Sequence, residues 1–79
     1  MWKLEYSNEA KFYFLDSGDL VFSLLVETTK LSRVPAGIPP DGCTNIGDGL
    51  IWWEVLDHIV IYERIEAENR LFVVIVKPM

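Results

Sequence analysis

The sequence predicts an α+β domain in which two helices cover one face of a mostly antiparallel sheet. Residues 2–6 alternate bulky and charged side chains, which is the period of a half-buried strand. Residues 8–31 carry apolar side chains at helical spacing, with an interruption at Gly18. Residues 50–77 contain runs rich in Val, Ile, Trp and Tyr, separated by short turns. The expected order is therefore strand, helix, helix, loop and a three-stranded meander.

The strand at residues 2–6 and the helix after it are indicated by period and by a capping residue. The strand places Trp2, Leu4 and Tyr6 on one face. Ser7 is well placed as the N-cap of a helix over residues 8–16, because its hydroxyl can accept a backbone N–H of the first turn. The inward face of this helix is expected to carry Ala10, Tyr13 and Phe14.

A second helix is expected at residues 20–31, after a break at residues 17–19 in which Gly18 permits a left-handed turn and Asp19 caps the next helix. One face carries Leu20, Val21, Leu24, Thr28 and Leu31. A further apolar set, Phe22, Leu25 and Val26, lies outside that face. A helix that is apolar on most sides is either sandwiched or faces a partner.

Residues 32–48 contain several prolines and glycines without periodicity, so we expect one long loop. The closing strands are expected at residues 50–56, 58–65 and 70–77. A two-residue turn at Leu56 and Asp57 predicts the pairs Glu54–Ile59 and Trp52–Ile61. A four-residue turn at residues 66–69 predicts the pairs Ile61–Val74 and Ile59–Val76.

This register divides the meander into two faces, which a one-residue shift would exchange. One face carries Trp52, Glu54, Ile59, Ile61, Glu63, Phe72, Val74 and Val76. The other carries Trp53, Val55, His58, Val60, Tyr62, Leu71, Val73 and Ile75.

Composition limits the function. The chain has 79 residues, enough for one domain over residues 1–79, and 51% of them are apolar, more than so small an interior can bury. A net charge of −5 argues against nucleic acid as a direct partner. The lone Cys43 excludes an internal disulfide and suits a reducing compartment. The absence of a signal-peptide or membrane-span pattern predicts a cytoplasmic protein.

Two stretches resemble the RelE/ParE superfamily of bacterial and archaeal toxins. WKLEYSNEAKFYFLD is similar to the family's strand followed by Tyr-Ser-x-Glu-Ala and a short helix. LIWWEVLDHIVIYERI is similar to the family's strand, tight turn, and "aromatic-Arg-aliphatic-aliphatic-Tyr" pattern. The resemblance implies a β-α-α-β-β-β fold and a small antitoxin as the partner.

The sequence also differs from this family at several functional positions. Placing Tyr62 on the family's tyrosine puts His58 on its aromatic residue and Ile59 on its arginine, which in messenger-cleaving members helps to stabilise charge on the scissile phosphate. Lysines often found on the preceding strand are replaced by Trp53, Glu54 and Val55, and the family's second basic cluster is absent after Lys77. Cleavage of RNA needs an acid, a base and cations at the phosphate, so the usual ribonuclease activity is not expected.

The weak catalytic candidates are Glu54, His58, Arg64 and Lys77, which could form a relocated constellation. We interpret His58 as a half-exposed turn histidine and Cys43 as an ordinary loop thiol, and we expect no metal and no cofactor. A carboxylate pair of Glu54 and Glu63 would require different environments for the two groups. Glu66 and Glu68 are interpreted as solvated turn residues.

By analogy with the family, the face that carries Ile59 is open, and it is apolar with an acidic edge. We predict partner binding through Trp52, Ile59 and Ile61, or through Phe22, Leu25 and Val26. The alternative is that residues 35–48 fold over this face.

The leading hypothesis is a toxin-fold protein of a toxin–antitoxin pair that acts by protein binding and is a homodimer when no antitoxin is present. The alternatives are a stand-alone homodimeric interaction module and a ribonuclease with the relocated constellation.

Overall fold

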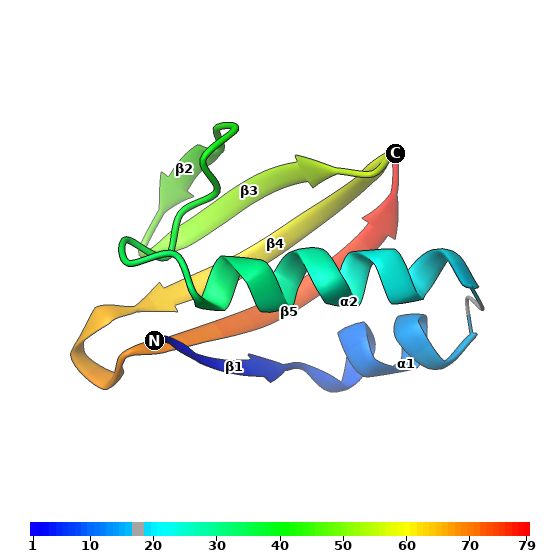
Figure 1. Ribbon diagram of the computed structural model, residues 1–79, viewed down its shortest axis with the longest axis horizontal. Helices are drawn as coiled ribbons and strands as arrows, with labels where there is room; N and C mark the ends of the chain where they lie inside the picture. The colour runs from blue at the N-terminus through cyan, green and yellow to red at the C-terminus, as the bar shows by residue number, and fades with distance from the viewer. Residues whose placement is uncertain (17–18) are drawn as a thin grey trace.

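The computed structural model describes residues 1–16 and 19–79 and confirms the α+β fold. The helices are α1 (Asn8–Asp16) and α2 (Asp19–Ser32), and a short 3-10 helix covers Glu66–Glu68. The strands are β1 (Lys3–Tyr6), β2 (Thr44–Gly47), β3 (Leu50–Val55), β4 (His58–Ile65) and β5 (Arg70–Pro78). They form a five-stranded sheet in the order β1-β5-β4-β3-β2. Only the β1–β5 pair is parallel, and α1 and α2 lie on the same side of the curved sheet (Figure 1).

The start of the chain folds as predicted. Trp2 is buried, and Leu4 and Tyr6 pack against the core, whereas Lys3 on the other face is exposed. Ser7 caps α1, because its Oγ accepts the backbone N–H of Ala10 at 3.1 Å. Of the break predicted at residues 17–19, residues 17–18 lie outside the described residues, and Asp19 is already the first residue of α2.

The inward face of α2 contains Leu24, Thr28 and Leu31, all buried as predicted. Thr28 is satisfied in this interior by a hydrogen bond of 2.8 Å between its Oγ1 and the hydroxyl of Tyr6. The predicted cap Asp19 and the predicted core positions Leu20 and Val21 have side chains outside the described part of the chain.

The prediction of one long loop over residues 32–48 is wrong at its end. Thr44–Gly47 forms β2, which pairs antiparallel with β3 and places Thr44 opposite Trp52. The connecting turn takes positive φ at Gly47, Asp48 and Gly49 (104°, 53° and 78°). A four-residue strand with a bulge is too short to show a period, so only its pairing with β3 reveals it.

The first predicted hairpin is confirmed. Leu56 and Asp57 form the two-residue turn with φ of 51° and 57°, the left-handed values that a type I′ turn requires. Glu54 therefore lies opposite Ile59, as the predicted register states.

The second hairpin departs from prediction midway. Tyr62 pairs with Val73 as expected, but Ile61 pairs with Ile75, so Val74 is an extra residue in a β-bulge. The predicted pairs Ile61–Val74 and Ile59–Val76 are therefore wrong. Beyond the bulge the faces of β5 exchange, so Val76 is buried and Ile75 is only half-buried.

The bulge lies beside the end of β1, where Ser7 contacts β5. The Ser7 backbone N–H donates to the carbonyl of Val73 at 2.8 Å, and Ser7 Oγ donates to the carbonyl of Val74 at 2.5 Å. At the bulge, the carbonyl of Val74 accepts a hydrogen bond from the Ser7 side chain in place of one from a neighbouring strand. Because this contact joins residues 67 positions apart, no local sequence pattern predicts it.

The loop after α2 is held against the helix-facing side of the sheet by three side chains. Trp2 Nε1 donates to the carbonyl of Pro35 at 3.1 Å, and Arg64 Nε donates to that of Ala36 at 2.7 Å. The buried hydroxyl of Tyr62 donates to the carbonyl of Gly37 at 2.8 Å. Because the loop packs here and then continues into β2, the alternative in which residues 35–48 cover the opposite face is wrong.

Candidate partner-binding surface

His58 is buried, with 3% of its surface exposed, so the prediction of a half-exposed turn histidine is wrong. The register places it opposite Val55 on the helix-facing side, beneath α1. Its Nε2 shares a hydrogen bond of 2.6 Å with the hydroxyl of Tyr13, and its Nδ1 lies 2.7 Å from the carbonyl of Leu56. Because that carbonyl only accepts, Nδ1 carries a proton. Both ring nitrogens are thus engaged in internal contacts.

Arg64 lies on the same side as His58 but about 20 Å further along β4, at ~3.3 Å per residue. Its guanidinium carbon is 4.9 Å from the centre of the Trp2 ring, and Nη1 is 3.3 Å from a carboxylate oxygen of Glu66. Together with the hydrogen bond to Ala36 in the loop, these contacts make Arg64 a structural residue that holds the loop and Trp2 against β4.

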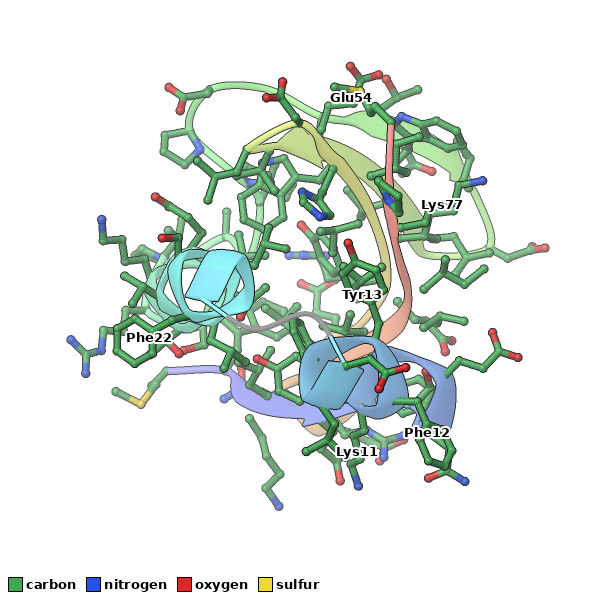
Figure 2. The ribbon with its side chains drawn as sticks, turned by 90° about the vertical axis from the view of Figure 1, so that its right-hand side faces the viewer. Lys11, Phe12, Tyr13, Phe22, Glu54 and Lys77 are labelled. Atoms are coloured by element: carbon green, nitrogen blue, oxygen red, sulfur yellow. The ribbon has the colours of Figure 1, made fainter. Side chains whose placement is uncertain are left out.

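Glu54 and Lys77 lie on the opposite, open face, where both are cross-strand neighbours of Ile59. Glu54 Oε2 accepts the indole N–H of Trp52 at 3.1 Å. Figure 2 shows Glu54 and Lys77 at the periphery, whereas Tyr13 points from α1 toward the sheet. The fold therefore divides the four catalytic candidates between two faces and does not bring them together.

Tyr62 belongs to the core, and the partly buried Tyr6 packs against it. Burial raises the pKa of the Tyr62 phenol well above its ordinary value. Burial likewise raises the pKa of Tyr6, and the hydrogen bond between Tyr6 and Thr28 opposes this effect. Phenols that hold their protons more tightly than usual are poor general bases.

The open face of the sheet is an apolar band with carboxylates beside it. Trp52, Ile61 and Ile75 form one cross-strand row. Each of these residues is half-buried, unlike the buried residues that alternate with them on the helix-facing side. The band consists of Trp52, Ile59, Ile61, Phe72, Val74 and Ile75, and it is named the open face below. The acidic residues of its rows are Glu5, Glu54 and Glu63.

Arg70, the first residue of β5, is neutralised by acidic neighbours. Arg70 Nη1 lies 2.8 Å from an oxygen of Glu5, and Nη2 lies 3.5 Å from one of Glu68. The hydrogen bond to Glu5 is the main cause that raises the pKa of Arg70. The open face therefore offers apolar contact and carboxylates more than free cations.

Two further surfaces lie beside α2. The predicted residues Phe22, Leu25 and Val26 line a shallow groove of about 390 Å³ with Thr29, Lys30 and Arg33. A second groove, of about 410 Å³, lies between α2, the loop and β3. Sequence reasoning missed this second groove, because Leu31, Pro39 and Trp53 line it from three separate segments.

The metal-ligand inventory is small. Among the described residues, no group of three or more His, Cys, Asp and Glu side chains is placed to hold a metal ion. Cys43 is a half-buried free thiol that packs against the core just before β2. Neither helix, over its described residues, is long and apolar enough to span a bilayer.

The same arrangement of helices and strands occurs in solved toxin structures. A chain of the intact E. coli RelBE toxin–antitoxin complex matches with a TM-score of 0.79 and 13% identity, over 100% of this chain and 98% of that chain. The isolated E. coli RelE toxin matches with a TM-score of 0.80 and 12% identity, over 99% and 84%. A metal-bound toxin from Helicobacter pylori matches with a TM-score of 0.64 and 20% identity, over 99% and 94%.

No protein-family model and no curated protein matches the sequence. The structural likeness alone shows that this chain has a RelE-like toxin fold, as the resemblance implied.

Proposed function

We propose that this chain is the toxin-fold member of a toxin–antitoxin pair and acts by binding protein through its open face, without messenger cleavage. The observation that carries the proposal is the chemistry at Ile59. In the family that the sequence resembles, this position is a phosphate-stabilising arginine. Here it is an isoleucine in an apolar band, with Glu54 beside it on β3 and Lys77 beside it on β5. An apolar patch with a polar rim is suited to a protein interface.

The partner that best fits this face is an antitoxin segment with large apolar anchors and cationic flanks. Trp52 and Ile61 would supply the apolar contact, because both are half-buried neighbours in one row. Glu54 and Glu63 would pair with lysine or arginine of the partner, and the overall charge of −5 would accelerate its approach. That the solved RelBE complex joins a toxin to an antitoxin supports this choice of partner.

The relocated ribonuclease constellation is not supported by the geometry. A base and an acid must both reach one phosphate, whereas His58 is buried under α1 and Glu54 lies on the other face. Lys77 and Arg64 are likewise on different faces of the sheet.

The test has two readouts. The chain is induced alone in a bacterial host while growth is recorded, and the purified chain is incubated with ribosomes and messenger. We expect growth arrest with intact messenger. Messenger that the unmodified chain cleaves, but that folded His58→Ala or Arg64→Ala variants leave intact, would overturn the proposal in favour of the ribonuclease. Normal growth would overturn the toxin role and favour the interaction module.

The surface is tested in the same assay. Trp52→Glu and Ile61→Glu should abolish growth arrest because each places a carboxylate in the apolar band. The matched control is Phe12→Glu, which makes the same change at a 70% exposed residue of α1 and should retain arrest. If Trp52→Glu remains folded and toxic, the open face is not the surface through which the chain arrests growth.

A further inference from the structure

One stripe along α2, continued by the first residue after the helix, does not pack against the hydrophobic core. It consists of Phe22, Leu25, Val26, Thr29, Lys30 and Arg33 and is named the α2 stripe. Phe22 is 71% exposed and Val26 is 39% exposed. Figure 2 shows Phe22 on the side of α2 that faces away from α1. A phenylalanine that the core does not use, next to other apolar residues, indicates a contact with another chain.

The two halves of the α2 stripe differ in chemistry. The first half is purely apolar, with Phe22, Leu25 and Val26. In the second half, Thr29 Oγ1 donates to the carbonyl of Leu25 at 2.8 Å, so its hydroxyl is satisfied within the helix and its methyl group is available for contact. The second half therefore combines a methyl group with the long aliphatic stems and the charges of the two cations.

We propose that the α2 stripe is a homodimer interface, in which α2 packs antiparallel against α2 of a second copy about a two-fold axis. A register centred between residues 27 and 28 places Phe22 opposite Arg33 of the second copy. Leu25 then lies opposite Lys30, and Val26 opposite Thr29. Each apolar side chain meets a guanidinium, an aliphatic stem or a methyl group, and the symmetry repeats every contact.

The antiparallel orientation follows from charge. A parallel pair would place Lys30 and Arg33 beside their own counterparts, which is repulsive. The antiparallel pair separates the two cationic ends by roughly two helical turns and lays each cation on apolar surface.

The choice of a second copy as the occupant also follows from charge. Two molecules of charge −5 repel, so self-association requires a surface without carboxylates. The α2 stripe contains none, and the neighbouring Glu27 is paired with Lys30 at 3.8 Å, whereas the open face would bring Glu54 and Glu63 of both copies together. The stripe is only about 16 Å long, and so small an interface suits a weak dimer with a dissociation constant on the order of 100 µM.

Sedimentation equilibrium up to about 500 µM, above this predicted dissociation constant, tests the proposal. The unmodified chain should pass from monomer to dimer, and Phe22→Glu should remain monomeric while its circular dichroism is unchanged. Phe12→Glu is the matched control, because Phe12 is 70% exposed but lies on the far side of α1 (Figure 2). A monomer throughout this range overturns the proposal. So does a dimer that Trp52→Glu disperses and Phe22→Glu leaves intact.

Disulfide trapping tests the orientation. With Cys43→Ser as the background, a mixture of the Phe22→Cys and Arg33→Cys variants should oxidise to a mixed dimer faster than either variant alone. Rapid cross-linking of Phe22→Cys with itself would indicate a parallel pair and overturn the antiparallel arrangement.

Discussion

Tyr13 on α1 and His58 on β4 share a hydrogen bond of 2.6 Å between the phenolic oxygen and Nε2. The two rings also meet edge to face, with their centres 5.6 Å apart and their planes at 69°. Since the other ring nitrogen is bound to the carbonyl of Leu56, the one histidine of the chain ties the first helix to the sheet beside the first hairpin turn. This relationship makes His58 a structural residue and leads to the first prediction.

Tyr13→Phe should lower the free energy of unfolding by about 1–2 kcal/mol, because it removes a partner of a buried imidazole nitrogen and leaves the ring packing in place. Urea denaturation at neutral pH measures this change. Phe12→Ala, at an exposed position in the same helix, should change stability by less than ~0.5 kcal/mol. Equal effects of the two variants would contradict the anchoring role of Tyr13.

Ser7→Ala should cost about 2 kcal/mol, because Ser7 Oγ both caps α1 and donates to the carbonyl of the Val74 bulge. Ser7→Asp separates the two roles, since a carboxylate can accept the Ala10 N–H but cannot donate to a carbonyl. We expect Ser7→Asp to be less stable than the unmodified chain in urea denaturation. If Ser7→Asp is fully stable, the contact with the bulge contributes nothing.

Gly37→Ala should destabilise the chain by at least about 2 kcal/mol, through backbone strain and overpacking. Gly37 has φ of +66°, and an added Cβ would lie 2.8 Å from Cε2 of Trp2, whose indole is held by Pro35. Gly42→Ala is the control, because its φ is +107° but nothing lies within 4 Å of the added Cβ. The difference between the two variants in thermal unfolding measures the contact with Trp2, and no difference would show that the ring moves freely.

Stability should fall at alkaline pH, and Tyr62→Phe should reduce the slope. The pKa of Tyr62 is raised above its ordinary value of 10.0 in the folded chain, so the unfolded chain loses this proton first. The resulting stabilisation is fully present below pH 10 and is lost as the pH rises toward the raised pKa, by up to about 1.4 kcal/mol per pH unit.

The Tyr62 effect is measured from denaturant midpoints between pH 8 and about pH 11, a range that spans the ordinary tyrosine pKa. Tyr62→Phe should be less stable at pH 8, because the carbonyl of Gly37 loses its donor, but should decline less steeply. Part of the slope should remain because burial also raises the pKa of Tyr6. Identical slopes for the two chains would contradict the prediction.

The sequence correctly predicted those parts of the fold that depend on neighbouring residues. The alternation at Trp2, Leu4 and Tyr6, the cap at Ser7 and the pairing of Glu54 with Ile59 all follow from local period or turn length. A strand of alternating residues can face a core in only two ways, and burial selects one of them.

The candidate surface could be predicted in part. The exposure of Phe22 and Val26 follows from helical spacing, because they lie outside the stripe that contains Leu24 and Leu31. The burial of His58 could not be predicted, because it depends on the distance from β4 to Tyr13 in a helix 45 residues away.

Only the tertiary structure determined the remaining features. The bulge at Val74 and the exchange of Ile75 and Val76 depend on the contact of Ser7 with β5. Strand β2 forms through its pairing with the edge of β3. Local side-chain patterns determine which residues form a strand or helix and which side is apolar. Contacts between residues far apart in the chain determine register shifts, short edge strands and the partners of buried polar groups. The free energy of such contacts is gained only after the chain has folded back on itself and brought the residues together.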